Sequence, residues 1–347
     1  MTVIGVCGYG FSGSSALVSL LKEYEETSTF KSGRLCEFAF PYEPDGLLDL
    51  EYNLLHAPAK HLKGDMAIHR FIQYTNFIKK TFDRETDGAF SRLTEEYIRS
   101  LIQVTYKCRR TSDHRNNQIG IFLEKLMRTI QIKLENRFKC SIKLLKEDDR
   151  YISVCPNGFI EKTRKYVSNL LMAAGVGAPN SVAIVDQPFP PNNPEQVFHF
   201  FEDPYAIVVD RDPRDIYLTV KNLRFSTARF VPHDDVFDFI SYFKAVSVHK
   251  KNEDGKRILR IHFEDLIYDY KNTVQKIENF LGIHQHNKIK QFFNPDVSIK
   301  NTQLSYVFPD DAKNVKIIEE KLADYLYPFD AEKKAKDREN IFKMASW

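Results

Sequence analysis

The sequence lacks the features that define several large classes of protein. Its five cysteines include no C-x-x-C pair, so neither a disulfide framework nor a zinc site is predicted. A formal net charge of +3 is too small to indicate nucleic acid as a partner, and we expect none. No apolar run approaches the roughly 18 residues of a membrane-spanning helix, so we expect no membrane span.

The first apolar stretch, Val3–Cys7, begins almost at position one and leaves no room for the parts of a signal peptide. Together with the unpaired cysteines, this predicts a soluble, cytoplasmic protein. The chain has 347 residues, 43% of them hydrophobic and 28% charged, which is typical of a globular protein. This length predicts one elaborate domain, residues 1–347, that includes a sizeable insertion.

The most informative stretch is the glycine-rich segment Gly8–Ser15, which joins this apolar run to a helix-like pattern beginning near Ala16. A glycine-rich turn between a buried strand and a helix presents bare backbone N–H groups and the positive end of a helix dipole. The segment therefore predicts a site for a phosphate or sulfate group. The residues expected to form it are Gly10, Phe11, Ser12, Gly13, Ser14 and Ser15.

This segment fits two motifs that imply different functions. Gly8, Gly10 and Gly13 form G-x-G-x-x-G, and Glu37 follows at about the offset of a ribose-binding carboxylate, which favours an NAD(P)-dependent oxidoreductase. The same segment forms G-x-x-x-x-G followed by Ser14-Ser15, where a P-loop kinase has lysine and then Ser or Thr. Without that lysine, phosphoryl transfer is disfavoured. A tight turn without a ligand is a further alternative.

Buried strands and helices alternate over much of the chain. Apolar runs at Ser181–Val185, Tyr205–Val209 and Ile258–Phe263 predict strands, with a possible second strand at Arg34–Phe38. The helices expected between or after them include Ser15–Tyr24, Glu195–Phe201, Tyr270–Leu281 and Ala312–Tyr325. This pattern predicts an α/β protein with a parallel sheet flanked by helices.

Residues 51–150 interrupt this alternation. Long charged segments of helical period predict helices at Phe71–Phe82, Thr94–Cys108 and Ile119–Phe138, and strand signals are nearly absent. We interpret the block as a large helical insertion that is either a lid facing the substrate, a structural cap or a dimer surface.

A second anion site is predicted where Tyr205–Val209 ends. Arg211 closes this strand, Asp212 and Pro213 suit a helix start, and Thr219 follows Arg211 by eight residues. Because eight residues span about two helical turns, the Arg211 guanidinium and the Thr219 hydroxyl can grip one anion. The alternative is a cluster of Asp–Arg ion pairs that stabilises the helix start.

These residues resemble the sulfotransferases that use 3′-phosphoadenosine 5′-phosphosulfate (PAPS). Gly10–Ser15 resembles the family's P-K-S-G-T-T loop, which cradles the 5′-phosphosulfate, and Arg211 with Thr219 resembles its Arg and Ser for the 3′-phosphate. Phe263–Leu266 and Phe280–Gly282 are similar to the family's Y-E-D-L and F-L-G motifs. The resemblance implies a three-layer, P-loop NTPase-like sandwich and sulfuryl transfer from PAPS to an acceptor hydroxyl without a metal.

The chain departs from this family at two points. Phe11 stands where the family usually has Lys or Arg, so backbone N–H groups, Ser14, Ser15 or a distant basic residue must meet the transition-state charge. The family's late glycine-rich basic loop is not recognisable, and Lys300 with Asn301 is a weak substitute. Both departures bear on activity more than on binding, so a non-catalytic binding module stays open.

The base that deprotonates the acceptor must be His, Glu or Asp. Glu37 is the first candidate, because the resemblance places a glutamate not far beyond the loop; His56, His61 and His69 are weaker candidates. Asp186 resembles a magnesium-binding carboxylate, and its neighbour Gln187 can contact donor or acceptor.

We expect a hydroxylated acceptor, such as a carbohydrate or a small metabolite. Phe and Tyr residues of the helical block suit stacking on a sugar, although aromatic residues at helical spacing are more often core.

Overall fold

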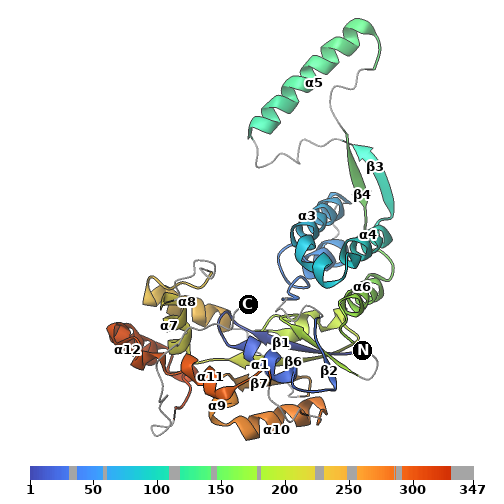
Figure 1. Cartoon of the computed structure of the whole chain (residues 1–347). Helices are drawn as coiled ribbons and strands as arrows, with labels where there is room; N and C mark the ends of the chain where they lie inside the picture. Colours follow the sequence, from blue (N-terminus) through green and yellow to red (C-terminus); the bar gives the residue numbers. More distant parts are fainter. Residues whose placement is uncertain are drawn as a thin grey trace.

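The computed structural model describes residues 1–30, 37–57, 61–108, 118–141, 147–177, 181–222, 230–247, 256–284, 286 and 291–329. Its centre is a parallel sheet of five strands in the order β2-β5-β1-β6-β7 (Figure 1). The strands are β1 (Thr2–Gly8), β2 (Thr27–Ser28), β5 (Val182–Asp186), β6 (Asp203–Asp210) and β7 (Ile258–His262). Helices flank the sheet, and this confirms the predicted fold class.

The strands are almost continuously apolar because both faces of the sheet are covered. In β1, Val3 and Cys7 belong to one buried cluster, whereas Ile4 and Val6 belong to another, as the alternation of side chains along a strand requires. The first cluster continues into α3, α4 and α6, and the second into α1 and α10. The bounds of these helices are Ser14–Leu21 for α1, His61–Glu85 for α3, Ala89–Leu101 for α4, Phe159–Ala173 for α6 and Tyr270–Leu281 for α10.

The strand order bears on the oxidoreductase alternative. In a dinucleotide-binding sheet, the second strand in sequence lies beside the first. Here β1 pairs with β5 and β6, and β2 lies outside β5. The sheet therefore does not have the dinucleotide-binding order, although its first loop fits the G-x-G-x-x-G motif.

The second strand differs from the expectation. The described strand is Thr27–Ser28, earlier than Arg34–Phe38, and residues 34–36 lie outside the described residues. Glu37 nevertheless forms a parallel bridge to Asp186, and the Phe38 N–H donates to the Asp186 carbonyl over 2.8 Å. Glu37 thus lies at the carboxyl edge of the sheet.

Between β2 and β5 the chain forms a region that includes α2 (Leu47–Glu51), a π-helix (Tyr52–His56), α3, α4, β3 (Val104–Cys108), α5 (Gln118–Phe138), β4 (Asp148–Ile152) and α6. Here one expectation was wrong: Thr94–Cys108 is not one helix, because α4 ends at Leu101 and β3 pairs with β4 in an antiparallel hairpin. The alternating Val104, Tyr106 and Cys108 was the missed strand signal. That residues 51–150 act as a lid within a single domain stays a prediction.

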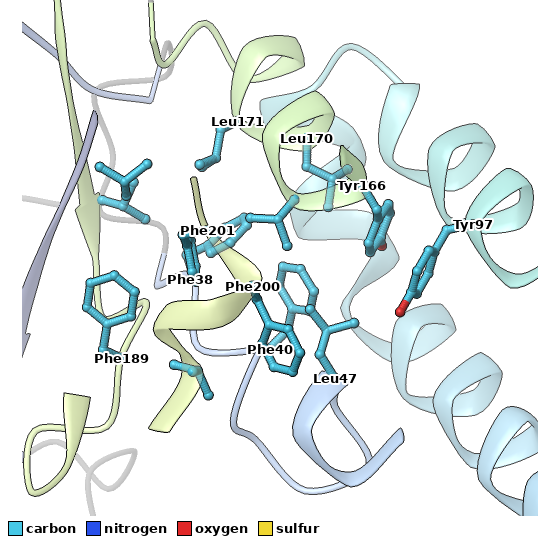
Figure 2. Packing of buried hydrophobic residues seen from close by; sticks show 14 of the residues in the cluster. Phe38, Phe40, Leu47, Tyr97, Tyr166, Leu170, Leu171, Phe189, Phe200 and Phe201 are labelled. Carbon is cyan, nitrogen blue, oxygen red and sulfur yellow. The ribbon is translucent and has the colours of Figure 1, made fainter. Parts of the chain in front are cut away.

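The aromatic residues of this region are mostly core (Figure 2). Phe38, Phe40 and Phe200 are each at most 1% exposed. Tyr97 and Tyr166 stack with ring centroids 4.4 Å apart, and each hydroxyl lies 2.7 Å from a buried threonine hydroxyl. These side chains therefore pack the insertion onto the sheet and are not available to stack on an acceptor.

The rest of the chain follows β5 in the sequence. It includes α7 (Pro213–Asn222), α8 (Val236–Ser247), α9 (Asp265–Tyr268), α11 (Pro295–Ser298) and α12 (Ala312–Lys321). Short 3₁₀ helices lie at Pro194–Phe200, Ile299–Asn301, Leu304–Tyr306, Pro309–Asp311 and Ala323–Tyr325. A third apolar cluster, formed mainly by α7, α8 and α12, fixes α7 beside the glycine-rich loop.

Candidate functional site

The glycine-rich loop connects β1 to α1 through two left-handed residues. Phe11 has φ of 66° and Gly13 has φ of 88°, and the Ser12 N–H donates to the Tyr9 carbonyl over 2.9 Å. Gly13 is the N-cap of α1, and no side chain caps this helix. The first N–H groups of α1 are thus left for an anion, and the helix dipole favours one there.

Gly13 is required for contact as well as for conformation. A Cβ at this position would lie 2.4 Å from the ring of Phe263, which packs directly against the loop. The buried Ser12 hydroxyl of the same loop has no hydrogen-bond partner in the described structure. The loop therefore has a tight floor and one unsatisfied donor.

Phe11 replaces the expected basic residue with an aromatic one that has its own partner. Its ring stacks on Phe230 with centroids 5.8 Å apart and planes 15° apart. Phe230 is 63% exposed, so the pair forms an apolar platform at the rim of the loop.

Gln187 connects the loop to the neighbouring strand. Its φ is 53°, its Oε1 accepts from the Gly8 N–H over 3.1 Å, and its Nε2 donates to Ser14 Oγ over 3.0 Å. Since Ser14 Oγ accepts this bond, its own hydrogen is free to point elsewhere. Ser15 is half-buried in the same first turn of α1.

Arg211 lies against the loop. Its NH1 donates to the Phe11 carbonyl over 2.6 Å, and its NH2 donates to Thr219 Oγ1 over 3.1 Å and to the Asn301 carbonyl over 2.6 Å. Arg211 is only 7% exposed, and its Nε has no partner in the described structure. The two predicted anion sites and the segment that contains Lys300 therefore meet in one place; the half-buried Lys300 precedes the carbonyl that Arg211 contacts.

Buried carboxylates hold the arginine region in place. Asp212 accepts from the Arg214 N–H over 2.8 Å and so caps α7, as predicted, and it also pairs with the Arg214 guanidinium. Asp215 accepts from the N–H groups of Gln303 and Leu304, which ties the 300s segment to α7. The Asp–Arg cluster of the alternative interpretation is thus formed by Arg214, and Arg211 is left facing the loop.

Two residues of the short motif after β7, Phe263 and Glu264, support the loop and the arginine region. Phe263 lies under Gly13 and also beneath Arg211, whose guanidinium is 5.3 Å from the ring centroid. Glu264 is fully buried and accepts from the Asp212 N–H over 3.0 Å. Burial, with repulsion by Asp215, raises the pKa of Glu264 to about 8, so it is mainly protonated at neutral pH.

A pair of carboxyl groups lies at the same edge of the sheet. The side chain of Asp186 is buried, and its Oδ1 has no hydrogen-bond partner in the described structure. Burial, followed by the negative charge of the exposed Glu37, raises the pKa of Asp186 to about 7, and Lys22 opposes the shift. Burial and Glu37 also raise the pKa of Glu43. Acidic groups are therefore concentrated beside Gln187 and the loop.

The histidine candidates have other partners. His56 Nε2 lies 3.3 Å from Glu51, and His69 Nε2 lies 3.1 Å from the Asp149 carbonyl in β4. The side chain of His61 lies outside the described residues. Over the described ranges, no group of three His, Cys, Asp or Glu residues is arranged to hold a metal ion.

Two residues of the candidate site were not recognised in the sequence as parts of it. Phe263 was part of a motif without an assigned role, and Asp186 was considered only as a magnesium ligand. Asp186 ends β5 and Phe263 follows β7 directly, so both lie at the carboxyl edge of the parallel sheet. This position at a strand end was the signal in the sequence that could have identified them.

A sequence model of the sulfotransferase family matches residues 4–287, which include the loop, Arg211 and the motif after β7. The chain therefore belongs to the sulfotransferase family. No individual curated protein matches it. In the described parts of the chain, no helix combines the length and hydropathy needed to cross a membrane.

Proposed function

We propose that this protein transfers a sulfuryl group from PAPS to the hydroxyl of a carbohydrate or small metabolite. Membership of the sulfotransferase family supports sulfuryl transfer in general. The observation that carries the choice of donor is the contact of Arg211 with the carbonyl of Phe11, which joins the loop to the arginine and Thr219. A nucleotide with phosphate groups at both its 3′ and 5′ positions requires two anion sites that lie this close together.

The loop side of this site takes the 5′-phosphosulfate. The uncapped first turn of α1 and the hydroxyls of Ser14 and Ser15 supply donors for its equatorial oxygens. Ser14 is held in place by Gln187, so its hydroxyl is oriented before the donor binds. These groups replace the charge that a lysine at Phe11 would bring.

The arginine side takes the 3′-phosphate. Arg211 Nε has no partner among the described residues, and Thr219 lies next to NH2. The contacts to the carbonyls of Phe11 and Asn301 position the guanidinium, and Lys300 adds a positive charge nearby. A phosphate that replaces a neutral carbonyl at NH2 gains a charge-assisted bond.

The carboxyl pair supplies the base. Glu37 lies beside Asp186, and the pKa of Asp186 is raised to about 7, which suits proton removal near neutral pH. In this proposal the oxygen of the acceptor hydroxyl attacks the sulfur of PAPS while Asp186 accepts the hydroxyl proton. The 3′,5′-bisphosphoadenosine then leaves. Glu37 keeps the pKa of Asp186 high.

Isothermal titration calorimetry with 3′,5′-bisphosphoadenosine tests the donor site. The wild-type protein should bind this nucleotide more tightly than NAD or magnesium-ATP. Arg211→Ala should weaken binding by about a hundredfold or more, because a buried charged contact is lost. Thr219→Val, which perturbs the fold less, should weaken it by about tenfold.

Arg257→Ala is the matched control for the arginine. Arg257 pairs with Asp203 beside the opposite end of β6, so its removal should leave nucleotide binding unchanged. Equal affinity for NAD, or binding that is the same in Arg211→Ala and wild type, would contradict the proposal. A panel of hydroxylated acceptors with labelled PAPS then tests turnover.

A further inference from the structure

The hairpin β3–β4 carries a helix with an exposed apolar face. Helix α5 is 21 residues long and lies beyond the hairpin, far from the sheet (Figure 1). Its exposed apolar residues include Ile119, Phe122, Leu123, Leu126 and Ile130, with exposed fractions of 73%, 66%, 51%, 46% and 40%. Side chains of this size are rarely exposed in such number on one element without a partner.

These five residues form one stripe. Their spacing of three or four residues, with Phe122 and Leu123 adjacent, places them on one side of the helix. All five are exposed, and none of them belongs to the buried apolar clusters of the described structure, so the helix is open along the stripe. The open side is therefore a surface that the fold does not use for its own core.

Positive charge is concentrated in the part of the sequence that contains this stripe. The segment between the two strands, residues 109–147, contains ten Lys and Arg but four Asp and Glu, a net charge of +6, whereas the whole chain carries +3. On α5 itself, Lys133 and Arg137 continue the stripe toward the C-terminal end, Lys125 lies beside it, and Arg128 lies on the opposite side of the helix. Long basic side chains can keep their charge in water while their stems cover apolar surface.

We infer that α5 docks this protein on an anionic lipid surface, with the stripe inserted among the acyl chains and the basic residues among the headgroups. A helix with Phe and Leu on one side and Lys and Arg around it suits the boundary between headgroups and acyl chains. Basic residues near an anionic bilayer each add favourable electrostatic energy that salt screens. The charge of +6 on residues 109–147 favours this occupant over a second copy of the chain, whose own residues 109–147 would bring the same charge. The inference does not depend on the proposed function.

Flotation with lipid vesicles tests this surface. The wild-type protein should float with vesicles that contain phosphatidylglycerol, should not float with pure phosphatidylcholine, and should be released by about 0.5 M NaCl. Phe122→Ser with Leu126→Ser should weaken binding by about tenfold or more, because two buried apolar side chains are lost. Lys133→Glu with Arg137→Glu, at the end of the stripe, should weaken it to a similar degree.

Phe77→Ser is the matched control, because Phe77 is 85% exposed on α3 and lies outside the stripe. It should bind vesicles as the wild type does, and circular dichroism should show that every variant remains folded. Wild-type protein that does not float with anionic vesicles, or that binds neutral vesicles equally well, would overturn the inference. So would a wild-type dimer in light scattering that becomes monomeric in Phe122→Ser with Leu126→Ser, since the stripe would then be covered by a second copy.

Discussion

The carboxyl edge of the sheet and the arm formed by β3, β4 and α5 both have an unusual distribution of side chains. The first has ionisable groups in its interior, and the second has large apolar side chains on its surface. The sheet edge buries ionisable groups: Arg211, Asp215 and Glu264 are each at most 7% exposed. The arm exposes hydrocarbon, from Ile119 to Ile130 on α5. Globular proteins more often expose charge and bury large apolar side chains.

The difference shows what each region is suited to bind. Buried charges are costly unless they are paired, and at the sheet edge they are held by neighbouring backbone groups and by one another. This arrangement fixes donors for a small anion. The exposed apolar stripe has no fixed hydrogen-bond donors or acceptors, so it suits contact with a large, deformable apolar surface. Variants in one region should therefore leave the function of the other unchanged.

The largest effect is expected from Asp186→Asn. Removal of the proposed base should lower kcat by about 10²- to 10⁴-fold, with the binding of 3′,5′-bisphosphoadenosine retained. The measurement is sulfate transfer from labelled PAPS to an acceptor that the wild type uses. Flotation with anionic vesicles should not change.

The control for this variant is Asp203→Asn. Asp203 lies at the opposite end of β6, where it pairs with Arg257 and accepts from Thr2 Oγ1. Its removal should alter kcat by less than about threefold. If Asp186→Asn retains wild-type kcat, the sheet edge binds nucleotide without the proposed base.

An intermediate effect is expected from two glycines, one at the sheet edge and one at the start of α4, the helix that precedes the arm. Gly13 and Gly88 both begin a helix in the left-handed conformation, with φ of 88° and 82°. A Cβ at Gly88 meets nothing within 4 Å, whereas one at Gly13 meets the Phe263 ring at 2.4 Å. Gly88→Ala should cost about 1–2 kcal/mol for conformation alone. Gly13→Ala should lower the free energy of unfolding by about 1–3 kcal/mol more than Gly88→Ala does, because the added Cβ overpacks against Phe263.

Urea unfolding of the two glycine variants measures this difference at a constant m-value. Equal losses in the free energy of unfolding would show that the Phe263 ring can move away from the added Cβ without an energetic penalty. The floor of the loop would then not be tightly packed.

The sequence predicted the sheet edge better than the arm, and the reason is physical. Buried parallel strands are continuous apolar runs, and their polar ends must meet at one edge, so local patterns were enough to place the loop, Arg211 and Glu37 at this edge. The contact of Arg211 with the Phe11 carbonyl joins residues 200 positions apart, and no local pattern contains it. The two strands of the arm were missed because β3 is short and mostly exposed, so neither burial nor length marked it.

The smallest effect is expected from Glu37→Gln, which changes the environment of Asp186 without removing it. Glu37 is negative and raises the pKa of Asp186, so its neutralisation should lower that pKa. The rate depends on deprotonated Asp186 and rises with pH through this pKa; the rising limb should therefore move to lower pH. The shift should be about one pH unit or less, because burial is the larger cause and remains. A pH profile of kcat between pH 5 and 9 measures it, and vesicle flotation at each pH should match the wild type. If Glu37 is itself the base, the substitution should instead lower kcat at every pH, and the roles of the two carboxyl groups would be exchanged.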